Sequence, residues 1–379
     1  MSLKKKRILS IVVLILILIE VSTIFLMYKS LNINVNNKSI KLNEQNKNIF
    51  AILLEKEDGT YEETDNWPIN GYIYDHDKSG CTDKDGNILS NVLSFNDDTN
   101  VATVNTNDTT YCYLYFSKLC KIADDSTVEA GLEGAKYNCK VDPNKPEYTF
   151  YLLDNNEDGT SDLIMNANIN ASREAVIPGV TSDTGTVAWL SKERYDSLGG
   201  ADLSNDGGAC QYGGICSSSL YGPVTALEYL HNATKNWTNV EPLSYTYNDR
   251  TTQGITSTDI GYQSFTSTNG VATITAGDSE GTQVTIGSSS EPLRARMPIR
   301  SSDASITEVA DKTDTNTNAF LYENISTSIP AGYWTMSSYA GTSSSSSPWF
   351  VDYNGRVVNY GRIDFAISRG VRPVITVEL

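Results

Sequence analysis

The chain has 379 residues, 39% of them hydrophobic, and a formal net charge of −17 at pH 7. This length predicts two domains together with an anchoring or targeting segment. The strongly acidic balance excludes nucleic acid as a partner, because binding to a phosphate backbone requires clustered lysines and arginines.

The N-terminus combines a basic cluster at 4–7 with a predominantly apolar run at 8–28. About 20 apolar residues span a bilayer as a helix, and a basic cluster beside such a span stays cytoplasmic. We therefore expect a cytoplasmic tail at 1–7, a retained transmembrane helix at 8–28, a stalk at 29–48, and a single-pass membrane protein with extracellular C-terminal domains. A cleaved signal peptide is the rival interpretation.

Glu20 interrupts the apolar run, and a carboxylate inside a membrane span is unfavourable unless it has a function. A glutamate five residues after a cleavage site resembles the first helix of type IV pilins. Ile15 stands where that family has glycine or alanine, and the apolar run ends at Tyr28, too soon for a pilin helix. We favour a plain anchor in which Glu20 is protonated or snorkels. A minor-pilin-like structural subunit is kept as an alternative.

Residues 49–145 predict a small β-rich module. The run 111–116 is rich in tyrosine and other β-favouring residues, which predicts a strand in the centre of a sheet. Turn signals at Asp58-Gly59 and Asp85-Gly86 separate the shorter strand-like segments.

Six cysteines follow the apolar run, and an even number in an exported chain predicts disulfides. Several pairings are possible, and proximity in sequence favours Cys81–Cys112, Cys120–Cys139 and Cys210–Cys216. No Cys-x-x-Cys occurs, so neither a thioredoxin-like site nor a zinc knuckle is indicated.

A candidate calcium loop opens the last predicted domain, which we place at 146–379. Four of its oxygen-bearing residues occupy ligand positions of an EF-hand-like loop: Asp154, Asn156, Asp158 and Asp162. Met165 stands at the position of the usual bidentate glutamate, and the flanking segments read as strands. A hairpin with an Asp-Gly turn explains the same residues without Ca²⁺, so both interpretations are open.

Two short helices are predicted within the C-terminal domain. Pro223 suits a first helical turn, and Val224, Leu227 and Leu230 form an apolar stripe behind it. Residues 305–308 form a capping-box pattern. The Thr- and Ser-rich segment 251–292 alternates weakly in polarity and predicts an inserted β-hairpin.

No catalytic constellation is recognisable. Only His76 and His231 are available as imidazole bases, and no Gly-x-Ser-x-Gly, Walker or dinucleotide-binding motif occurs. Both histidines read as ordinary turn or surface residues. We therefore expect a protein that is not an enzyme.

The last 50 residues carry the most distinctive pattern. A Tyr333-Trp334 opening precedes a serine run, a predicted hairpin at 349–360 and a closing Gly-Val-Arg-Pro at 370–373. Asn354-Gly355 suits the two positive-φ positions of a type I′ turn.

In their order, these pieces resemble the C-type-lectin-like domains of the bacterial sulfatase-modifying-factor type, over about residues 185–379. They are especially similar to those of surface proteins and of variable proteins diversified by retroelements. The segment 293–298 also looks like the stretch before a short helix in that family. The resemblance implies an α+β fold class: an N-terminal transmembrane helix, a small β-rich module and a C-terminal C-type-lectin-like domain. A relative of this fold is an oxidase that uses cysteines in its lectin-like domain. No cysteine follows Cys216 here, so an exported enzyme on that scaffold is only an alternative.

The function that we predict is a membrane-anchored cell-surface recognition protein, which binds a protein or glycan ligand through the exposed face of its last domain. Serine and tyrosine suit such a face, because they supply adaptable hydrogen bonds and rigid amphipathic area. The expected ligand-binding residues are Tyr339, Ser343, Ser345, Tyr353, Asn359, Tyr360, Asp364 and Phe365. The resemblance further implies that this face is a hypervariable patch written by a diversity-generating retroelement.

Overall fold

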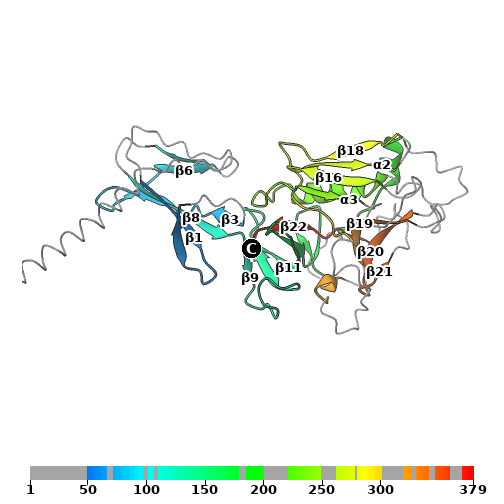
Figure 1. The fold of residues 1–379 in the computed structure, drawn as a ribbon, viewed down its shortest axis with the longest axis horizontal. Helices are drawn as coiled ribbons and strands as arrows, with labels where there is room; N and C mark the ends of the chain where they lie inside the picture. Colours follow the sequence, from blue (N-terminus) through cyan, green and yellow to red (C-terminus); the bar gives the residue numbers. More distant parts are fainter. Residues whose placement is uncertain are drawn as a thin grey trace, which may run out of the picture. The chain divides into compact units, whose positions relative to one another are not determined.

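The computed structural model describes residues 49–65, 71–96, 101–105, 110–178, 185–199, 221–248, 262–277, 280–300, 319–325, 330–340, 346–358 and 369–379. The chain divides into two compact units, Met1–Lys118 and Leu119–Leu379, which we call unit 1 and unit 2 (Figure 1). Each has hydrophobic residues of its own beneath its sheets.

Unit 1 is built on one sheet with the strand order β2-β1-β8-β4-β5, with β3 also pairing with β8. The strands are β1 (Ile49–Glu55), β2 (Tyr61–Thr64), β3 (Tyr72–Tyr74), β4 (Gly80–Thr82), β5 (Ile88–Leu89) and β8 (Tyr111–Lys118). A separate pair joins β6 (Leu93–Asn96) to β7 (Val101–Val104). The predicted central position of 111–116 is confirmed, because β8 pairs with β1, β3 and β4. Its inward side chains Leu114 and Phe116 pack with Ile52 and Ala102.

Two of the three predicted disulfides are confirmed. Cys81 and Cys112 face each other across β4 and β8, and Cys120 and Cys139 face each other across two strands of unit 2. They close loops with sequence separations of 31 and 19 residues, and loops of that length stabilise by about 3–4 kcal/mol each in the chain-entropy model. Cys210 and Cys216 lie outside the described residues.

Unit 2 is organised around a five-stranded antiparallel sheet with the order β22-β12-β11-β10-β9. Its strands are β9 (Cys120–Ile122), β10 (Lys136–Cys139), β11 (Tyr148–Asn155), β12 (Ser161–Met165) and β22 (Val374–Val377). The chain end therefore returns to pair with β12, while β9 and β10 belong to this sheet although we had placed 119–145 in the first module. A short pair, β13 (Asn168–Ile169) with β14 (Ala175–Val176), follows β12.

A second sheet of unit 2 consists of β15 (Tyr245–Tyr247), β16 (Ser264–Thr268), β17 (Val271–Thr275) and β18 (Gln283–Ile286), joined in chain order. Period-2 alternation buries Phe265, Ile274 and Val284 and leaves the threonines between them on the other face. Helix α3 (Val224–Thr234) contacts this sheet (Figure 1). The predicted stripe of Val224, Leu227 and Leu230 is fully buried. The shorter helix α2 (Lys192–Ser197) is N-capped by the Ser191 side chain.

The third sheet contains β19 (Gly332–Ala340), β20 (Ser346–Asp352) and β21 (Val357–Val358). Tyr333, Val351 and Val357 share a hydrophobic cluster with the 3₁₀ turn η3 (Ala319–Tyr322) and with residues of β11, β12 and β22. The predicted hairpin at 349–360 is present, as β20 pairs with β21.

The predicted fold class is wrong. Strands make up 41% and helices 9% of the described residues, which contain two α-helices, so this part of the chain is predominantly β rather than α+β. The physical reason is that segments rich in threonine, tyrosine and alternating apolar residues form sheets in both units, whereas only one helical stripe is strong. The predicted helix at 305–308 lies outside the described residues.

The predicted transmembrane helix and single-pass membrane location are also corrected. The helices α2 and α3 have 6 and 11 residues, whereas a membrane span needs about 20. No helix in the described part of the chain is long and apolar enough to cross a membrane. Residues 8–28, on which the prediction was based, lie outside that part.

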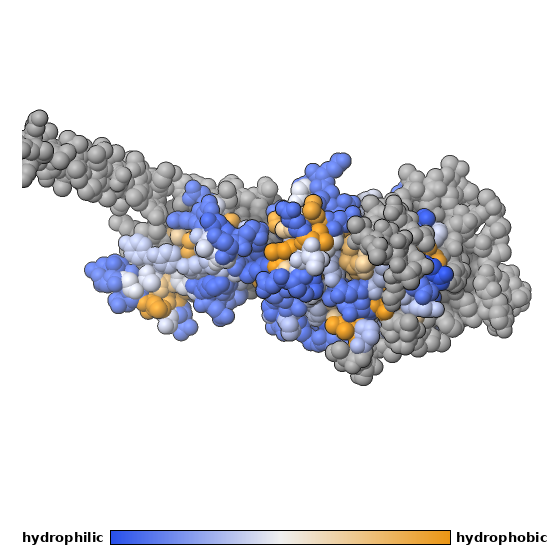
Figure 2. All heavy atoms as spheres, turned by 90° about the horizontal axis from the view of Figure 1, so that it is seen from below, coloured by the Kyte–Doolittle hydropathy of each residue, from blue (hydrophilic) through white to orange (hydrophobic). Residues whose placement is uncertain are grey.

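The described surface is mainly hydrophilic on the face drawn in Figure 2, where hydrophobic residues show only as small separate patches. Exposed large hydrophobic side chains are few among the described residues, and they include Tyr113 in unit 1 and Tyr353 in unit 2. An exposed aromatic residue on such a surface is a feature that ligand-binding faces share.

Candidate functional site

The framework of the candidate site is an irregularity in β19. Trp334 pairs with Phe350 and Ser338 with Pro348, so 335–337 bulge opposite a single residue of β20. Two backbone carbonyl groups of the bulge accept hydrogen bonds from buried aromatic side chains. Trp189 Nε1 donates to Thr335 O at 2.8 Å, and Tyr262 OH donates to Met336 O at 2.6 Å. The segment that looked most informative in sequence therefore acts first as a structural junction of unit 2.

Ser337 is the second anchor of this junction. Its Oγ accepts hydrogen bonds from Tyr247 OH and from the backbone N of Arg300, both at 3.0 Å. The backbone N of Met336 donates to Pro298 O at 2.8 Å. The bulge therefore fixes the backbone of 298–300 beside β20.

The turn between β20 and β21 is held by Asp352, which is 3% exposed. One of its carboxylate oxygens accepts the backbone N–H groups of Asn354 and Arg356, both at 2.9 Å. The other oxygen accepts Arg356 Nε at 3.1 Å and Nη2 at 2.8 Å. This network fixes the position of Tyr353, whose side chain is 39% exposed at the tip.

The predicted type I′ turn is wrong in detail. Gly355 has a φ of +80°, while Asn354 does not adopt a positive φ. Asp352 N donates to Arg356 O, and Gly355 N donates to Asp352 O. The loop is therefore a three-residue one, with a type I turn followed by a left-handed glycine. The carboxylate cap from Asp352 favours this form over the two-residue turn.

Two arginines stack on consecutive aromatic residues of β20. The guanidinium carbon of Arg300 lies 3.9 Å from the ring centroid of Trp349, and that of Arg369 lies 4.1 Å from the ring centroid of Phe350. Partial burial lowers the pKa of Arg300, and the Tyr247 hydroxyl partly opposes this shift. A guanidinium on an aromatic face contributes about 0.5–2 kcal/mol and keeps its N–H edge available.

The predicted ligand-binding residues are only partly covered by the structure. Tyr353 is exposed on the turn, and the backbone of Tyr339 lies in β19. The other six lie outside the described residues: Ser343, Ser345, Asn359, Tyr360, Asp364 and Phe365. Trp334, Val371 and Val374 are buried, whereas Trp349 is only partly buried. The sequence analysis selected neither Arg300 nor Trp349 as a binding residue; the one signal for Arg300 was an arginine-rich stretch, 294–300, in an acidic chain.

The candidate calcium loop is a hairpin turn in the structure. Asp158 accepts hydrogen bonds from the backbone N and the Oγ1 of Thr160, which lower the pKa of its carboxyl. Asp162 is buried and binds Arg296 and Thr376, so its carboxylate is engaged elsewhere. Asn156 donates to the Thr160 hydroxyl, and Asp154 accepts from the backbone N of Asn155.

The same Glu-Asp-Gly-Thr sequence occurs at 57–60 in the β1–β2 turn. There too Gly59 has a positive φ, and Asp58 accepts two hydrogen bonds from Thr60. Leu54 and Lys56 occupy its first and third loop positions, so that turn forms without a ligand set. No group of three or more histidine, cysteine or acidic side chains able to hold a metal ion occurs within the described ranges.

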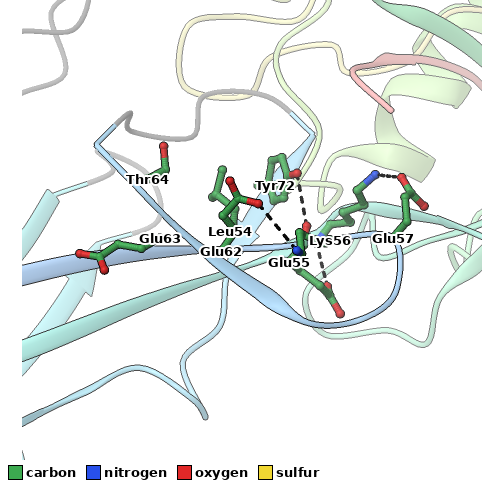
Figure 3. A pocket seen from close by; sticks show the side chains of 9 residues that line it. Leu54, Glu55, Lys56, Glu57, Glu62, Glu63, Thr64 and Tyr72 are labelled. Atoms are coloured by element: carbon green, nitrogen blue, oxygen red, sulfur yellow. Dashed lines mark hydrogen bonds and ion pairs between the residues drawn. The ribbon is translucent and has the colours of Figure 1, made fainter.

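Unit 1 carries a surface hollow (Figure 3). It is lined by Leu54, Glu55, Lys56, Glu57, Glu62, Glu63, Thr64, Tyr72 and Lys118. Its two lysines pair with its own glutamates, Lys56 with Glu62 and Lys118 with Glu57, as the dashed lines show. Glu55 is almost buried and accepts the backbone N of Lys118. Both lysines of the hollow are therefore engaged by its own glutamates, and its four glutamates against two lysines leave it acidic.

Both histidines contact other groups of the protein. His231 Nε2 lies 2.9 Å from Glu291 O, and His76 packs edge-on against Tyr74.

Comparison with known proteins identifies no relative, because no family model, no curated protein and no solved structure matches the chain.

Proposed function

We propose that this chain is a recognition protein that binds a ligand through the exposed end of the β20–β21 hairpin in unit 2. The observation that supports the proposal is the way Tyr353 is presented. An exposed aromatic side chain stands on a turn whose backbone is held by the buried carboxylate of Asp352. A side chain presented in a fixed conformation loses little entropy on binding, so it contributes more of its contact energy to affinity.

The surrounding sequence favours the same interpretation. In the sequence, the segments 339–347 and 353–360 are rich in serine, tyrosine and asparagine, residue types whose hydroxyl and amide groups suit a binding face. The two disulfides are typical of proteins that fold in an oxidising compartment, where an extracellular protein or glycan would be available.

Binding of the full chain to a glycan array and to a panel of extracellular proteins tests the proposal. Tyr353→Ala should remove the strongest signal. The matched control is Tyr113→Ala, since Tyr113 is also an exposed tyrosine, 42% against 39%, but belongs to β8 of unit 1. An absence of any ligand above background, or an equal loss with Tyr113→Ala, would refute the proposal.

The finer proposal is that this face is diversified by a retroelement. Adenine-directed change of asparagine codons would produce the serine, tyrosine, aspartate and phenylalanine residues found at the predicted positions. The neighbouring DNA tests the idea. A near-copy of the codons for about residues 337–370, differing only at adenines and lying near a reverse-transcriptase gene, would support it. Without such a repeat, the binding face has a fixed specificity.

A further inference from the structure

Arg300 is a partly buried cation that meets no anion within the described part of the chain. Its Nε is buried without a hydrogen-bond partner there, and its guanidinium makes its contact with the ring of Trp349, 3.9 Å from the centroid. Burial lowers the pKa of its guanidinium and a coulombic interaction with Tyr247 opposes this shift, whereas no carboxylate of the described residues contributes to it. A cation in such a position is unfavourable unless it gains from binding an anion.

Other arginines of unit 2 are satisfied by the protein itself. Three bind carboxylates: Arg194 binds Glu228, Arg296 binds Asp162 and Arg356 binds Asp352. Arg372, although fully buried, donates to the backbone carbonyls of Leu321 and Glu323. In a chain with a net charge of −17, carboxylates are abundant, so it is informative that none of the described ones pairs with Arg300.

The backbone of Arg300 is also fixed in advance. Its N–H donates to Ser337 Oγ, which accepts a second hydrogen bond from the buried Tyr247 hydroxyl. Stacking on the indole orients the guanidinium plane and leaves its edge of N–H donors for an acceptor in that plane. A carboxylate can accept two parallel hydrogen bonds from such an edge. The ammonium group of a lysine at this position would lack the planar pair of donors that this geometry needs.

We infer that Arg300 and Trp349 form a subsite for the carboxylate of an acidic sugar. The inference rests on the proposed function and names the ligand class of the same face. Trp349 lies in β20 and Tyr353 lies on the turn that directly follows this strand, so the subsite and the exposed tyrosine belong to the same hairpin.

The choice of an acidic sugar over other anions follows from charge and strand geometry. The net charge of −17 repels polyanions, so a ligand with isolated carboxylates is favoured over phosphate-rich chains. A peptide that adds to the sheet needs a free strand edge of several residues. Of the two edge strands, β21 has two residues, and β19 already donates backbone hydrogen bonds from Trp334 to Gly370 and from Met336 to Pro298.

The experiment is a calorimetric and saturation-transfer NMR titration of the full chain with glucuronate, N-acetylneuraminate, glucose and the methyl ester of glucuronate. Binding of at least one acid and neither uncharged compound is expected. Arg300→Gln should abolish it, and Arg300→Lys should weaken it about tenfold, because the charge stays while the fork is lost. The matched control is Arg194→Gln, which removes an arginine that Glu228 neutralises and should leave the titration unchanged.

Several outcomes would overturn the inference. They are a parent protein that binds no acidic sugar, equal binding of the ester, and unchanged affinity in Arg300→Gln. Binding of a peptide with a free C-terminus but of no acidic sugar would also reject it. The melting temperature of Arg300→Gln should stay within a few degrees of the parent; if it collapses, the Lys variant decides. If Tyr353→Ala abolishes ligand binding on the arrays while Arg300→Gln does not, the proposed function stands and this subsite fails.

Discussion

The buried pair of Asp162 and Arg296 offers the sharpest test of how unit 2 is held together. Asp162 Oδ2 accepts Arg296 Nη2 at 2.7 Å, and its Oδ1 accepts the Thr376 hydroxyl at 2.5 Å. The side chains of Arg296 and Asp162 are 0% and 5% exposed. Asp162→Asn removes the negative charge that the buried guanidinium of Arg296 faces in this pair. Breaking one partner of a buried pair costs about 3–5 kcal/mol, which is a large fraction of the stability of an ordinary domain.

Urea unfolding followed by tryptophan fluorescence measures this loss, because four of the five tryptophans (189, 237, 334 and 349, but not 67) belong to unit 2. The double variant Asp162→Leu/Arg296→Met should recover most of the loss, since it removes both charges together. The losses in unfolding free energy of the two single variants would then not sum to the loss of the double variant. A cost below about 1 kcal/mol for Asp162→Asn, or additive singles, would refute the reasoning.

Three further predictions concern the turns, the glycines and pH. Added calcium should change the melting temperature of neither the parent protein nor Asp158→Ala. A calcium-dependent rise in the parent that Asp158→Ala removes would restore the ion-binding interpretation. Gly332→Ala should destabilise unit 2 by more than about 1 kcal/mol in the same urea assay, because Gly332 has a φ of +145° and a Cβ there would lie 2.0 Å from Val351 O; an unchanged midpoint would contradict this. Burial, together with the charges of Glu174 and Asp142, raises the pKa of Tyr148 to about 12 from 10.0. Its contribution to stability should therefore be present below pH 10 and be lost as pH rises from about 10 to 12, and Tyr148→Phe should flatten that part of a pH–stability curve.

Local signals in the sequence predicted local structure well. The tyrosine-rich run at 111–116 became the central strand β8, and the apolar stripe behind Pro223 became α3. Cysteines close in sequence formed both described disulfides, since each pair lies directly opposite on neighbouring strands. In each case the residues that determine the element are close together in the sequence, so the local sequence pattern is enough to predict it.

Contacts between distant segments were not predictable in the same way. Strand β22 pairs with β12 from the far end of the chain, and β9 and β10 join that sheet rather than the sheet of unit 1. The threonine-rich stretch was expected to form one hairpin, but it contributes β16, β17 and β18 to a four-stranded sheet. The α+β class came from a family resemblance rather than from these patterns, and this explains why the class was wrong although several elements were right.

The candidate site shows why binding residues are harder to infer than scaffold. Tyr353 could be selected from sequence because a tyrosine next to an Asn-Gly turn is expected at the surface, where turns lie. Arg300 could not, because its role depends on a bulge in β19 that brings Ser337 to its backbone and on the position of Trp349 beneath its guanidinium. The sequence shows an arginine that could equally have met one of the chain's many carboxylates. The three-dimensional arrangement shows that, among the described residues, its guanidinium meets an indole instead, and an arginine held on an aromatic ring in this way is suited to binding an external anion.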